Sequence, residues 1–83
     1  MQLDLIEADV HNREEQLKRC KAKLRYLGNL HVSFDLLEAH KEAMKLLEQE
    51  EFYLQDQLYH LKSLVAILKE EQDYSRDEML PKV

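Results

Sequence analysis

Two pairs of a carboxylate and a histidine have a spacing that suits metal binding on a helix. Glu7 precedes His11 by four residues, and Asp56 precedes His60 by the same interval. This interval places both side chains on one helix face, where a carboxylate oxygen and an imidazole nitrogen can ligate one ion. Each pair supplies only two ligands, and the sequence lacks the Glu-x-x-His spacing that di-metal helical bundles use. We therefore expect contacts along a helix surface, and neither a metal nor a cofactor.

The sequence gives little support for covalent chemistry. Cys20 is the single cysteine and lies in an apolar heptad pattern, where cysteine acts as a small hydrophobe more often than as a nucleophile. The sequence contains neither a glycine-rich phosphate loop nor a zinc-ligand pattern. Ser75–Glu78 fits an acid-directed phosphorylation site or a capping box, and both interpretations of Ser75 stay open. The sequence predicts a protein that is not an enzyme.

The composition predicts an all-α protein. The chain has 83 residues, of which 45% are hydrophobic and 16 are leucine, but only one glycine and one proline. Sheets need more turn residues than this, and disordered chains carry fewer aliphatic side chains. The net charge of −5 would repel nucleic-acid phosphates and anionic lipids. Because no apolar run approaches the roughly 20 residues of a membrane span, we expect no nucleic-acid binding and no membrane insertion. We expect a cytoplasmic location, with a nuclear one as the alternative.

Apolar residues in the first third recur in steps of three and four, which is the spacing of one helix face. This pattern, interrupted only by Arg13, predicts a first helix over residues 2–27. Gly28 follows at a position where a left-handed cap is most often glycine, so we expect a turn over 28–33. Ser33 would cap a second helix over residues 34–74, followed by a frayed tail over 75–83.

The second predicted helix carries two apolar stripes. One stripe comprises Leu37, His40, Met44, Leu47, Glu51, Leu54, Leu58, Leu61, Val65 and Leu68. The other comprises Leu36, Ala39, Ala43, Leu46, Glu50, Tyr53, Gln57, His60, Leu64 and Ile67. A helix in a two-stranded coiled coil needs one stripe, so the second predicts a bundle of three or four helices.

We expect the first helix to fold back antiparallel on the second as a coiled-coil-like helical hairpin. Leu27 would then lie near Phe34, and Arg13 near Glu48 and Glu51. The predicted hairpin core comprises Leu3, Ile6, Val10, Leu17, Leu24, Leu27, Phe34, Leu37 and Met44. The alternative is one long helix in a parallel coiled coil.

The longer second helix would extend past the first, leaving five apolar side chains without a partner in the chain. At roughly 1.5–3 kcal/mol per buried side chain, exposing them would forfeit on the order of 10 kcal/mol, as much as the stability of a small domain. We therefore expect a homodimer with a four-helix core, in which the two long helices pair. The predicted interface comprises Leu47, Leu54, Leu58, Leu61, Leu64, Val65, Ile67 and Leu68.

These expectations lead to two hypotheses for function. The first is a non-enzymatic oligomerisation and protein–protein interaction module of a scaffold or adaptor, which associates with its own copy and with another helical or globular protein. The alternative is a regulatory effector-type coiled coil that binds a globular partner, such as a small GTPase or a kinase. An apolar patch left exposed by the dimer would favour the alternative.

Overall fold

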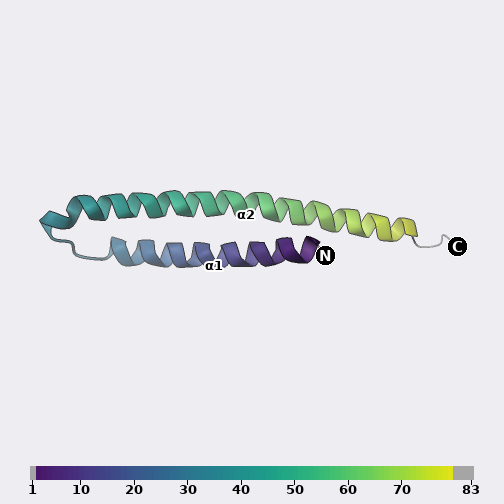
Figure 1. The fold of residues 1–83 in the computed structure, drawn as a ribbon, viewed down its shortest axis with the longest axis horizontal. Coiled ribbons are helices and arrows are strands. Elements are labelled where there is room, and N and C mark those ends of the chain that lie inside the picture. The colour runs from purple at the N-terminus through teal and green to yellow at the C-terminus, as the bar shows by residue number, and fades with distance from the viewer. Residues whose placement is uncertain (1, 80–83) are drawn as a thin grey trace.

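The computed structural model describes residues 2–79, and the side chains of residues 3–72. Helix α1 spans Gln2–Gly28, helix α2 spans Leu37–Met79, and a 3-10 turn, η1, spans Phe34–Leu36. The two long helices lie side by side in opposite directions and are joined at one end (Figure 1). No strand occurs within residues 2–79. The predicted all-α antiparallel hairpin is confirmed, and the turn excludes one continuous helix.

The helices end later than the sequence predicted. Helix α1 includes Gly28, and α2 continues to Met79 instead of ending at residue 74. The extension of α2 has a physical reason, since no glycine or proline occurs between Leu37 and Pro81. Residues 80–83 of the predicted tail lie outside the described residues.

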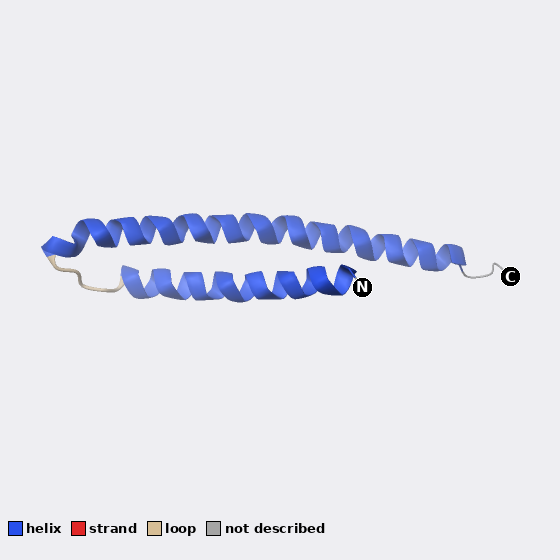
Figure 2. Cartoon of the chain, in the orientation of Figure 1, coloured by secondary structure: helices blue, strands red, loops and turns tan. Residues whose placement is uncertain are grey.

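The turn is built differently from the one predicted. Gly28 does not have a positive φ, so the expected left-handed cap is absent there. Instead, the N–H of Asn29 donates to the carbonyls of Arg25 and Tyr26, at 3.2 Å each, and closes the last turn of α1. A loop then leads to η1 (Figure 2). Ser33 precedes η1, but its side chain makes no cap hydrogen bond.

Burial is concentrated at three residues between the helices. Among the side chains of residues 3–72, the buried ones are Cys20, Leu54 and Leu58, which are 2%, 4% and 6% exposed. These residues lie on the line of contact between the two helices, which we call the seam. Further apolar side chains along the seam are half-buried: Leu3, Ile6, Val10, Leu17, Leu24, Leu27, Met44, Leu47, Leu61, Val65 and Leu68. A pair of helices thus encloses a narrow apolar seam rather than a wide core.

The register between the helices differs from the prediction. Leu27 lies beside His40, whose Nε2 is 2.7 Å from the Leu27 carbonyl oxygen, and not beside Phe34. The loop and η1 together form a connection long enough to carry Phe34 past the end of α1, where its side chain is 88% exposed. Leu37 is exposed for the same reason. Phe34 and Leu37 therefore leave the predicted hairpin core.

The shift brings α1 further along α2 than predicted. Glu7 pairs with Lys69 at 3.2 Å, and Val10 and Val65 line one hollow between the helices. Leu54, which was predicted for the dimer interface, is consequently buried within the chain. The same holds for Leu58, while Leu47, Leu61, Val65 and Leu68 are half-buried along the intrachain seam. Of the predicted interface residues, only Leu64 and Ile67 are exposed.

We predict that Gly28→Ala stabilises the hairpin. Gly28 needs no positive φ, and a Cβ built there would meet the Met44 Cε at 3.9 Å, which is ordinary contact. Alanine loses less backbone entropy on folding, so the free energy of unfolding should rise by about 0.5–1 kcal/mol. Denaturant unfolding followed by circular dichroism measures the change. A fall in stability would show that Gly28 is required for the turn.

Candidate interaction surface

One stripe of apolar side chains on α2 is not covered by α1. Leu46, Tyr53, Leu64 and Ile67 are between 42% and 64% exposed, whereas Leu54 in the neighbouring seam is 4% exposed. We name the exposed stripe the α2 flank. The sequence had placed these four residues on the second stripe, but the predicted interface omitted Leu46 and Tyr53. The alternation of three and four residues was the signal that identifies them.

The α2 flank borders the groove between the two helices. Tyr53 and Gln57 of α2 line an open hollow together with Asp9, Asn12 and Arg13 of α1. These α1 residues therefore lie on the same side of the hairpin as the flank. Leu5 precedes Asn12 by seven residues and Tyr26 follows it by fourteen, so both lie along the same line of α1. Both are exposed, at 72% and 67%.

A chain of hydrogen bonds crosses the groove at its centre. The Nε of Arg13 donates to Oε1 of Gln57 at 3.0 Å, and Nε2 of Gln57 donates to the Tyr53 hydroxyl at 2.8 Å. Arg13 also pairs with Asp9 on its own helix. The predicted contact of Arg13 with Glu48 and Glu51 is therefore replaced by an amide partner. Because Tyr53 accepts from Gln57, its own hydroxyl proton can be donated to a neighbour on the exposed side.

A second pair of exposed aromatic side chains lies elsewhere on α2. Phe52 and Tyr59 are 72% and 69% exposed and are seven residues apart, on the face adjacent to the flank and away from α1. The Tyr59 ring meets the His60 ring edge-on, with centroids 5.4 Å apart. These two aromatics form a separate patch from the α2 flank.

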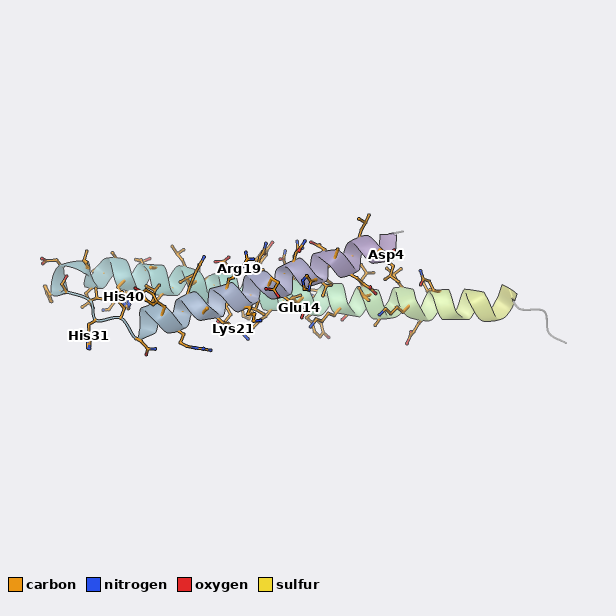
Figure 3. The ribbon with its side chains drawn as sticks, turned by 90° about the horizontal axis from the view of Figure 1, so that it is seen from below. Asp4, Glu14, Arg19, Lys21, His31 and His40 are labelled. Atoms are coloured by element: carbon orange, nitrogen blue, oxygen red, sulfur yellow. The ribbon has the colours of Figure 1, made fainter. Side chains whose placement is uncertain are left out.

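One of the two carboxylate–histidine pairs makes the predicted contact along the helix surface. Asp56 Oδ1 is 3.5 Å from His60 Nε2, and both side chains are mostly exposed. Glu7 is instead engaged across the hairpin by Lys69. Within the described residues, no group of three or more histidine, cysteine or acidic side chains could hold a metal ion. The labelled histidines, His31 and His40, lie at the turn end of the hairpin, far from Asp4 (Figure 3).

Cys20 is buried in the seam between the two helices. Its thiol donates to the Leu47 carbonyl oxygen at 3.2 Å. Burial raises the pKa of the Cys20 thiol, and the carboxylates of Glu50 and Glu51 raise this pKa further. The neutral, buried thiol is therefore a packing group and a weak nucleophile.

Comparisons with other proteins give no assignment. No family model, curated protein or solved structure matches this chain. Within the described residues, neither helix has a stretch that is both long and apolar enough to cross a membrane. The surface of the hairpin is therefore the feature from which a function can be inferred.

We predict that Cys20 reacts slowly with thiol reagents while the protein is folded. Burial and the raised pKa both lower the thiolate population, so modification at neutral pH should be at least about tenfold slower than in denaturant. A spectrophotometric thiol assay with and without denaturant measures the ratio. Equal rates would contradict the buried position.

The raised pKa also predicts an alkaline loss of stability. Because the folded state holds the Cys20 proton more tightly, its stabilising contribution is complete below the pKa of the unfolded thiol. The contribution is lost as the pH rises through the higher, folded pKa. The denaturant midpoint should fall more steeply with alkaline pH in the natural chain than in Cys20→Ser, which keeps a hydrogen-bond donor for Leu47 but does not titrate there.

Proposed function

We propose that the chain is a non-enzymatic oligomerisation and protein–protein interaction module of a scaffold or adaptor, and that it acts as a homodimer. The observation that carries this proposal is the α2 flank, an apolar stripe exposed along a hairpin that has few buried residues. A complete burial contributes roughly 1.5–3 kcal/mol per large apolar side chain. Covering four half-exposed side chains would thus add about 5 kcal/mol per chain.

The size of the hairpin supports the same proposal. Of the side chains of residues 3–72 in this 83-residue hairpin, few are fully buried, and folds with a small core commonly add disulfides, metals or oligomerisation. The single cysteine of this chain cannot form an intrachain disulfide. Association through the α2 flank is a route to stability that its surface offers.

A globular partner is a second candidate, favoured by a different observation. Phe52 and Tyr59 lie outside the α2 flank and would stay exposed in a dimer that covers only that flank. Exposed aromatic pairs of this kind suit a protein interface, because tyrosine and phenylalanine are enriched there. A regulatory coiled coil that binds a small GTPase or a kinase would use such a patch.

We predict that the chain forms a dimer at micromolar concentration and that Leu46→Glu dissociates it. Light scattering should give about twice the 10.0 kDa chain mass for the natural protein. A carboxylate at position 46 would have to be buried without a partner, so the dissociation constant should rise at least about tenfold. Helicity should be retained, since Leu46 is exposed within the hairpin.

The matched control is Phe52→Glu, which adds the same charge to an equally exposed site on another face. This variant should remain dimeric. A natural chain that stays monomeric at high micromolar concentration would refute the proposed function. A dimer lost in Phe52→Glu and kept in Leu46→Glu would place the interface on the aromatic patch instead.

A further inference from the structure

The stripe to which the α2 flank belongs can pair with an antiparallel copy of itself. Going outward from position 55, positions of the second apolar stripe of α2, which contains the flank, occur at the same distances in both directions. Positions 53 and 57 are the nearest, then 50 and 60, then 46 and 64, then 43 and 67. Such a stripe can face a second copy of itself that runs in the opposite direction, with every stripe position from 43 to 67 opposite another stripe position.

We infer that the occupant of the α2 flank is a second, antiparallel copy of this chain, with position 55 of α2 at the twofold axis and Leu46 of one copy facing Leu64 of the other. This inference rests on the proposed dimer and specifies its orientation and register. The remaining layers pair Ala43 with Ile67, Glu50 with His60 and Tyr53 with Gln57, each across the axis.

The layers of this register are chemically matched. A small alanine opposes the larger Ile67, which keeps the two helices at a constant separation. The Glu50 carboxylate opposes the His60 imidazole, which can donate a hydrogen bond to it. Tyr53 has a hydroxyl proton to donate, and the Gln57 amide of the second copy supplies an acceptor.

Two other arrangements are poorer. A parallel pair of α2 helices would place Glu50 against its own copy, and like charges directly opposed are destabilising. An antiparallel register shifted by one heptad toward the C-terminus would place Leu46 opposite Glu71, and Glu50 opposite Ile67. Both changes bring a carboxylate against an apolar side chain, which costs free energy because the charge loses its water.

The first helix supports the same axis independently. Arg13 is bonded to Gln57, so position 55 of α2 lies beside the part of α1 near position 15. A twofold axis at this level passes between the two α2 helices, perpendicular to the plane that contains both. It places the two copies of α1 on the same side of that plane, next to each other. Leu5 and Tyr26, the exposed apolar residues on this line of α1, lie on opposite sides of position 15 at nearly equal distances. Leu5 of one copy would therefore face Tyr26 of the other.

The contact is long enough for a stable dimer. The paired positions 43–67 extend about 36 Å at a helical rise of about 1.5 Å per residue. A standard interface covers about 800 Å² per partner, which is roughly a tenth of the 7237 Å² surface of this chain. With the α1 contacts added, the assembly is a four-helix bundle in which each helix touches two others.

Cysteine cross-linking of the full chain tests the register. In a Cys20→Ser background, Leu46→Cys and Leu64→Cys are prepared separately, and the dimer mass of each is first checked by light scattering. Mild oxidation of the mixed variants should give cross-linked dimers containing one of each, because facing positions lie within disulfide reach. Each variant alone should give almost none, since its two cysteines lie about 27 Å apart by helical rise.

A second pair tests the α1 contact. Leu5→Cys mixed with Tyr26→Cys should likewise cross-link only in the mixture, while Phe52→Cys is the control that should not cross-link. Cross-linking of Leu46→Cys with itself would show a parallel dimer and overturn the inference. A dimer by mass without the mixed cross-link would also overturn it while leaving the proposed function standing, and a monomer by mass would refute both.

Discussion

The apolar seam between α1 and α2 is the constraint on which the remaining features depend. Two helices enclose side chains on one line of contact only, so burial falls off within a residue or two of that line. Cys20, Leu54 and Leu58 lie on it and exclude water almost completely. Side chains on either side of this line stay partly exposed to solvent, including those of the α2 flank. A helix pair thus produces its own exposed apolar surface, because its geometry cannot cover more than one face of each helix.

Polar contacts determine how the helices are aligned along the seam. Apolar side chains tolerate slippage by a heptad, since leucine can replace leucine in most layers. The hydrogen bond from Arg13 to Gln57 distinguishes alignments, because a slip of one heptad toward the C-terminus of α2 would place Leu64 where Gln57 accepts. The Arg13 side chain, which weakens the apolar pattern of α1, is therefore the group that makes one alignment better than its neighbours.

The hairpin could be predicted from the sequence, whereas its alignment could not. The two heptad patterns and the break between them were sufficient to predict the helices and their antiparallel packing. The alignment depended on the path of residues 29–36, and the sequence predicted a turn over residues 28–33 with Phe34 packed in the hairpin core. The chain instead closes α1 through Asn29 and adds η1, which moves Phe34 outward and brings Leu54 inward. Loop conformation depends on a few backbone angles that leave no periodic signal in the sequence. The predicted alignment was therefore wrong, and as a result Leu54 and Leu58 were assigned to the dimer interface instead of the hairpin core.

The contact of His40 with the Leu27 carbonyl holds the C-terminal end of α1 against α2, whereas the N-terminal end of α1 is held less firmly. The last carbonyls of a helix have no partner within that helix, and here α2 supplies one through the His40 ring. Unwinding the C-terminal turn of α1 therefore breaks a tertiary bond as well as helical ones. At the opposite end no loop connects α1 to α2, and the polar link there is the partly exposed ion pair of Glu7 with Lys69, which contributes little. Local opening consequently begins at the N-terminus of α1 and proceeds toward the turn, so the N-terminal amides exchange with solvent first. The turn acts as a hinge that keeps α1 close to α2, so that the contacts between the two helices form again in the same register.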